Sequence, residues 1–151
     1  MLGWKEFSSA APVIAEAGSR LLGLNEVAFL ATVSATARPR IHPVVPRIVE
    51  ERIVAFIMDS SPKLKDLQNR RQYSIHTLPG NEDEEFFASG EAVYCDTETR
   101  FRDAAANAMG FATGVDEHHI LYEFRFDRAL HTQWLDFGTP KHRPKRTHWS
   151  L

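Results

Sequence analysis

The chain opens with apolar side chains at helical spacing. Five of them recur at intervals of three and four residues, which places them on one face of a helix: Ala10, Val13, Ile14, Ala17 and Leu21. We therefore expect an N-terminal helix over about residues 8–22. Gly23 is expected to mark its end, because glycine readily adopts the left-handed conformation that closes many helices.

Short β-rich runs bounded by turn residues follow and predict a succession of strands. They cover residues 27–33, 39–49, 53–58, 73–78, 84–95 and 120–127, with 129–134 as the hairpin partner of the last. A proline donates no ladder hydrogen bond, so the second strand is expected to be bent around Pro43. Gly90 is expected to mark a bend or bulge.

Two further helices are expected between these strands. A short one begins at residues 60–63, where serine and proline suit the first positions of a helix. A longer one covers residues 97–109 and stops at Gly110. Strands joined by connections too short for helical crossovers must pair antiparallel. The pattern therefore predicts a mainly β (α+β) fold, a small closed or partly closed barrel of six to seven antiparallel strands with flanking helices.

Composition narrows the class of protein. Hydrophobic residues make up 43% and charged residues 25% of the 151 residues, which favours a single globular domain over residues 1–151. The 18 Lys and Arg against 20 Asp and Glu leave no basic excess, so we expect no nucleic-acid partner. The single cysteine, Cys95, cannot form an internal disulfide. No apolar run is long enough to cross a bilayer and no secretion signal is evident, so no membrane partner and a cytoplasmic location are expected.

The segment Ser60-Ser61-Pro62-Lys63 is a candidate anion site. The N-terminus of a helix presents unpaired amide groups and a partial positive charge, to which two hydroxyls and a lysine would be added here. A well-capped surface helix with solvated lysines explains the same residues, and composition alone favours that reading.

Two other groups of cations could meet an anion. Arg38, Arg40 and His42 would share one face of a strand, either toward a ligand or as a solvated outer surface. The basic C-terminal tail, residues 139–151, carries four cations and is expected to be solvated and frayed, although Trp149 favours some burial. His118 and His119 are adjacent and would point to opposite faces of a strand, so we expect no metal site there.

Taken in order, these segments resemble the pyridoxamine 5′-phosphate oxidase-like family of flavin-binding split barrels. The matching segments are the first helix and residues 27–33, 38–44, 54–58, 61–67 and 89–92. They cover roughly residues 10 to 97, and their order and spacing carry the resemblance.

The resemblance implies a split barrel that forms a homodimer with two FMN sites between the protomers. It implies that the strand from Arg40 runs along the flavin ring with His42 near the phosphate, and that the serines and Lys63 hold the phosphate. The implied cofactor-binding residues are Arg40, His42, Pro43, Val44, Ile57, Met58, Ser60, Ser61 and Lys63.

The chain departs from the vitamin B6 oxidases of this family. It lacks a glutamine near Glu85 and Phe86 and a longer C-terminal region with an arginine–histidine motif. The resemblance therefore implies an FMN-dependent oxidoreductase that acts on another small-molecule substrate, with no catalytic residue dictated. An F420-dependent reductase of the same fold and a non-catalytic flavin- or haem-binding protein are the alternatives.

Overall fold

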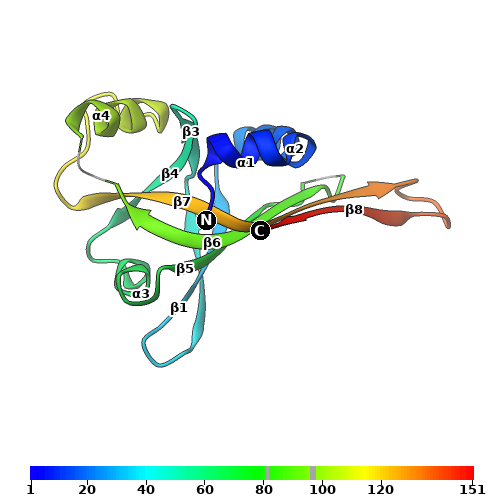
Figure 1. Ribbon diagram of the computed structural model, residues 1–151, viewed down its shortest axis with the longest axis horizontal. Helices are drawn as coiled ribbons and strands as arrows, with labels where there is room; N and C mark the ends of the chain where they lie inside the picture. Colours follow the sequence, from blue (N-terminus) through cyan, green and yellow to red (C-terminus); the bar gives the residue numbers. More distant parts are fainter. Residues whose placement is uncertain (81, 96–97) are drawn as a thin grey trace.

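The computed structural model describes residues 1–80, 82–95 and 98–151 (Figure 1). The helices are α1 (Trp4–Ala10), α2 (Pro12–Leu24), α3 (Pro62–Arg70) and α4 (Thr99–Ala108). The strands are β1 (Ala28–Val33), β2 (Pro39–Val44), β3 (Arg47–Val49), β4 (Arg52–Met58), β5 (Gln72–Thr77), β6 (Glu85–Tyr94), β7 (His119–Leu135) and β8 (Arg143–Ser150). The start of the predicted helix at residue 97 lies outside the described residues.

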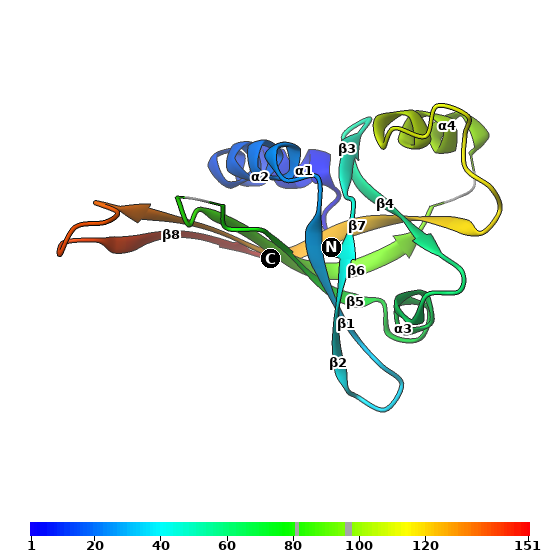
Figure 2. The ribbon, with the colours of Figure 1, turned by 180° about the vertical axis from the view of Figure 1, so that it is seen from behind.

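All eight strands belong to one antiparallel sheet that is curled into a half-barrel (Figures 1 and 2). The strand order is β2-β1-β5-β6-β7-β4-β3, and β8 pairs with β7. The chain passes from β2 to β3 through only Val45 and Pro46, although these strands stand at opposite ends of that order. The sheet must therefore curve until its two edges approach each other. The predicted mainly β, antiparallel fold with flanking helices is confirmed.

The predicted strand over residues 39–49 is two strands rather than one bent at Pro43. Pro43 lies within β2, at the edge of the sheet where its missing N–H is tolerated. The break falls at Val45 and Pro46, because proline restricts the preceding residue and removes a donor there.

A bulge lets β7 continue where a hairpin was predicted. The register pairs Gly90 with Phe126 but Ser89 with Arg128, so Asp127 is an extra residue on β7. This insertion shifts the buried positions from Phe124 and Phe126 to Ala129, which in the sequence resembles two separate strands. The predicted hairpin between residues 120–127 and 129–134 is therefore wrong, whereas the predicted irregularity at Gly90 is confirmed.

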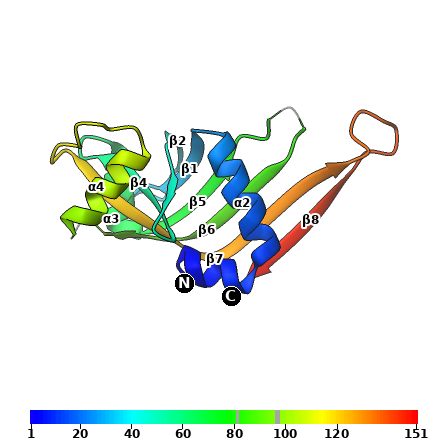
Figure 3. The same cartoon turned by 90° about the horizontal axis from the view of Figure 1, so that it is seen from above.

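The basic tail is a strand and not a frayed end. Residues 143–150 pair with residues 128–135 of β7, and the resulting β7–β8 hairpin extends away from the body (Figure 3). Trp149 fixes its base, since its ring lies edge-on to Phe7 with 5.0 Å between the ring centroids. Main-chain pairing along a whole strand and this aromatic contact outweigh the solvation of the cations, a tertiary effect that local composition does not report.

The predicted N-terminal helix over residues 8–22 is interrupted. Ala11 separates α1 from α2 with φ −138° and ψ 61°, because Pro12 disfavours a helical conformation in the residue before it. Pro12 then begins α2, where its missing N–H costs nothing. Val13 is exposed, contrary to the predicted apolar face, whereas α1 contributes Trp4 and Phe7 to the core.

Two apolar clusters hold the fold together. The larger lies between the inner face of the sheet and helices α1 and α2, with α2 crossing over β6 and β7 (Figure 3). Phe7 stacks on Phe126 at a centroid distance of 4.8 Å in this cluster. The smaller lies beneath α4, on the other face of β4 and β7. Among the described residues, no helix combines the length and apolar character that a membrane span requires.

Substitution of Gly90 should test the bulge. A Cβ at this position would overlap the carbonyl oxygen of Arg125 on the neighbouring strand. We expect Gly90→Ala to lower the free energy of unfolding by about 3 kcal/mol, as judged by chemical denaturation. Gly23→Ala is the matched control, because a Cβ in α2 meets open space there and alanine favours helix. Equal stability of both variants would contradict the close approach at Gly90.

Candidate functional site

The start of α3 lies against the edge strand β2 and brings several polar side chains together. Register determines which they are: Arg40 and His42 lie opposite Thr32 and Leu30 on β1, so all four share the face that α3 covers. Lys63, one residue inside α3, donates a hydrogen bond from Nζ to the carbonyl oxygen of Pro43 at 3.2 Å. Figure 2 shows α3 beside the β1–β2 hairpin.

Asp66 fastens the helix to the two strands. Its buried carboxylate accepts a 2.8 Å hydrogen bond from the Thr32 hydroxyl, and Arg40 Nη1 lies 3.2 Å from its other oxygen. The positive charge of Arg40 is thus balanced within the protein. Arg40 fixes the geometry of the site but contributes little net charge to it.

Lys63 and His42 are the other basic side chains of this cluster. Among the described residues, neither forms a hydrogen bond or an ion pair with Asp66. Burial lowers the pKa of the Lys63 ammonium group. His42 Nε2 is buried and has no hydrogen-bond partner in the described part of the chain. Burial, followed by the charge of Lys63, lowers the pKa of this imidazole.

Helix α3 begins where the sequence predicted, with Ser61 at the N-cap position and Pro62 after it. The Ser61 side chain makes no capping hydrogen bond among the described residues. Its hydroxyl and the adjoining helix N-terminus remain available to a ligand. Ser60 lies exposed in the turn between β4 and α3.

The structure separates the other predicted cofactor residues. Val44 and Ile57 are buried in the core, so their side chains serve packing. Met58 points to the opposite face of β4 from Ile57 and is half-exposed, and Pro43 is exposed on the outer face of β2. Arg40, His42, Ser61 and Lys63 therefore lie around the start of α3, where Pro43 contributes its carbonyl oxygen and Ser60 lies in the preceding turn.

These residues fit a phosphate group. The site combines a lysine ammonium, an unpaired imidazole nitrogen, an uncommitted hydroxyl and the N-terminus of a nine-residue helix. An orphaned buried nitrogen costs free energy unless a ligand or water completes its hydrogen bonding. The donor set suits an anion with several oxygen acceptors, as in the phosphate of FMN.

Sequence reasoning missed Asp66 and Thr32. A signal was present, because Asp66 falls between Leu64 and Leu67 on the apolar side of α3. A carboxylate on the buried face of an amphipathic helix requires a partner. Sequence reasoning also missed the 2.7 Å hydrogen bond between His118 Nδ1 and Asp59, beside the turn into α3. This hydrogen bond raises the pKa of the His118 imidazole.

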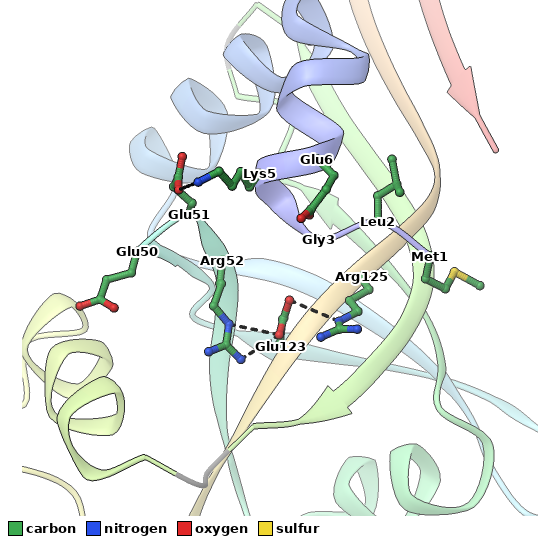
Figure 4. A pocket seen from close by; sticks show the side chains of 10 residues that line it. All are labelled: Met1, Leu2, Gly3, Lys5, Glu6, Glu50, Glu51, Arg52, Glu123 and Arg125. Carbon is green, nitrogen blue, oxygen red and sulfur yellow. Dashed lines mark hydrogen bonds and ion pairs between the residues drawn. The ribbon is translucent and has the colours of Figure 1, made fainter.

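A polar pocket lies on the other side of β4, beneath the N-terminal segment (Figure 4). Glu123 of β7 is buried there, and Arg52 approaches one of its oxygens from Nε at 3.1 Å and from Nη2 at 2.8 Å. Arg125 Nε lies 3.4 Å from the other oxygen. The guanidinium of Arg52 also covers the Phe101 ring of α4 at 4.1 Å. This group connects β4, β7 and α4 and is explained by structure alone.

Neither protein-family models nor curated proteins match the sequence. Solved structures do match the fold. A heme-binding protein from Mycobacterium smegmatis superposes with a TM-score of 0.69 at 18% identity over 89% of this chain, which spans 57% of the length of that protein. A protein from Clostridium acetobutylicum related to general stress protein 26, of the pyridoxinephosphate oxidase family, superposes with a TM-score of 0.67 at 9% identity, over 93% of this chain and 95% of its own.

A pyridoxamine 5′-phosphate oxidase-related, FMN-binding protein from Nostoc punctiforme gives a TM-score of 0.60 at 16% identity, over 93% of this chain and 96% of its own. At these identities the likeness concerns the fold. The chain therefore has the pyridoxamine 5′-phosphate oxidase-like split-barrel fold, as the resemblance implied. Proteins with this fold include both FMN binders and heme binders.

Loss of Arg52 should expose the role of the Glu123 group. Arg52→Met leaves the buried Glu123 carboxylate with Arg125 as its remaining partner. We therefore expect the free energy of unfolding to fall by about 3 kcal/mol. The double variant Arg52→Met/Glu123→Gln removes the uncompensated charge and should recover most of this loss in the same denaturation assay. An additive or larger loss in the double variant would show that charge compensation is not the cause.

Proposed function

We propose that this chain is an FMN-dependent oxidoreductase that acts on a small-molecule substrate. One observation carries the proposal: Lys63, at the start of α3 where Ser61 makes no capping bond, donates to the carbonyl oxygen of Pro43, next to His42 with its unpaired Nε2. The fold supports it, since an FMN-binding protein superposes over nearly the whole chain.

The residues of the site have distinct roles in this proposal. Lys63 supplies the charge that attracts a phosphate dianion, the Ser61 hydroxyl supplies a directed donor, and the helix N-terminus adds its partial positive charge. Asp66 holds α3 against Thr32 and Arg40, so the phosphate site is already formed before a ligand binds. FMN, when bound, supplies hydride- and electron-transfer chemistry, and the protein contributes binding and orientation.

Haem binding is the second candidate, because a heme-binding protein superposes with a TM-score of 0.69. The absorbance spectrum of the purified protein separates the two. Flavin bands support the first candidate and a Soret band the second. A colourless protein that binds F420 would instead favour the deazaflavin-dependent reductase.

Lys63→Ala should weaken FMN binding. A charge-assisted hydrogen bond to phosphate contributes about 1.5–3 kcal/mol, so the dissociation constant should rise about 10- to 100-fold when measured by quenching of flavin fluorescence. Lys65→Ala is the matched control, because Lys65 is exposed on the same helix and makes no contact with the site among the described residues. Equal increases of the dissociation constant in the two variants would contradict the role of Lys63 in the phosphate site.

We also propose that two copies of the chain pair through the outer face of the β1–β2 hairpin. Phe29 and Ile41 are 43% and 70% exposed there, although both are large and apolar. Phe29 lies opposite Pro43 and Ile41 opposite Ala31, so the four form one continuous apolar surface. A second copy bound to this surface would therefore contact β2, the strand that also carries His42.

Light scattering should therefore report twice the mass of the single chain. Ile41→Asp places a charge at the centre of the proposed contact and should yield monomers. Val13→Asp, on an exposed position of α2, should leave the mass unchanged. A monomeric unaltered protein would refute the pairing without affecting the phosphate site.

A further inference from the structure

We propose that His42 takes up a proton when a phosphate group binds at the start of α3, so that anion binding at this site depends on pH. This rests on the proposed function in one respect, namely that the natural anion is the phosphate of the cofactor. It concerns how the site exchanges one proton for an anion.

The imidazole of His42 has one ring nitrogen, Nε2, that lacks a hydrogen-bond partner among the described residues. Its Nε2 is buried and unpaired among the described residues, although the ring lies on the same face as Arg40 and Asp66. The carboxylate of Asp66 is occupied by the Thr32 hydroxyl and by Arg40. No described residue therefore accepts a hydrogen bond from Nε2 of a protonated His42, and a bound anion would supply that acceptor.

Burial and the net effect of the charges around His42 disfavour its protonated form without a ligand. Lys63 on α3 and Arg40 on β2 oppose a positive imidazole, and Asp66 on α3 favours it. The cross-strand neighbour on β1 is Leu30, which is apolar and buried. Burial is the largest influence, and the net result is a pKa for His42 below its usual value.

A bound phosphate dianion reverses this balance. Two negative charges beside Nε2 stabilise the imidazolium, whose pKa therefore rises above its value in the free protein. Between those two pKa values the imidazole is neutral when free and protonated when bound. Linkage then requires uptake of one proton on binding, and the logarithm of the association constant falls by about one per pH unit as the pH rises through this window.

Lys63 supplies the contrast. The ordinary pKa of a lysine lies well above neutral pH, so a lysine contributes attraction to an anion with little pH dependence there. His42 contributes attraction only while it can be protonated. The two residues thereby divide affinity from pH sensitivity.

The first experiment measures the titration in the unaltered protein and uses one variant for assignment. The His42 ring protons of the flavin-free protein are titrated by NMR with and without inorganic phosphate, and the resonance is assigned by its absence from His42→Asn. We expect phosphate to raise the pKa of His42. An unchanged His42 pKa at saturating phosphate overturns the proposal.

The second experiment measures protons directly. Calorimetry of FMN binding at about pH 7.5, in buffers of different ionisation enthalpy, should show uptake of about one proton, since the flavin phosphate with a second pKa near 6 is then already a dianion. Riboflavin, which has the ring but no phosphate, should bind without uptake. His42→Asn should bind FMN more weakly and without uptake, and the matched variant His148→Asn should behave as the unaltered protein.

The outcomes separate this inference from the proposed function. FMN binding with equal proton uptake in the unaltered protein and in His42→Asn overturns the role of His42 and leaves the cofactor assignment intact. Absence of FMN binding overturns the cofactor assignment, and the phosphate titration then decides the inference alone. If phosphate raises the pKa of His42 although FMN does not bind, the inference about His42 is supported for a different phosphorylated ligand.

Discussion

The close approach of β6 and β7 at Gly90 is the constraint on which the half-barrel depends. Asp127 is inserted opposite the bond between Ser89 and Gly90, and the space for the carbonyl of Arg125 exists only because residue 90 has no side chain. The bulge increases the local twist of both strands. One continuous strand can then pair with β4 at its beginning, β6 along its length and β8 at its end.

That curvature positions the candidate site. A curled sheet brings the edge strand β2 within reach of the turn that leaves β4, and α3 fills the space between them. Asp66 completes the contact through Thr32 and Arg40. A buried carboxylate would be costly by itself, and a hydroxyl together with a guanidinium compensates it. The helix N-terminus is thereby held against the strand that carries His42.

The two faces of the sheet use buried acids in the same way but for different ends. Glu123 is neutralised by Arg52 and Arg125 and connects strands to α4 (Figure 4). Asp66 is neutralised by Arg40, and neither Lys63 nor His42 has a carboxylate partner in an ion pair among the described residues. The difference between a structural ion-pair group and a candidate binding site is therefore the presence of donors without acceptors.

Local chemistry in the sequence was sufficient for strands β1, β4, β5 and β6, the start of α3 after two serines and the irregularity at Gly90, because each depends on near neighbours. The family resemblance also indicated the split barrel and the grouping of Arg40, His42 and Lys63. Only the tertiary structure decided that residues 143–150 form a strand, since its stability comes from β7 and Phe7 far away in the chain. It likewise decided that Val44 and Ile57 are buried and that Asp66 pairs with Arg40, because burial and charge compensation arise only when distant segments are brought together.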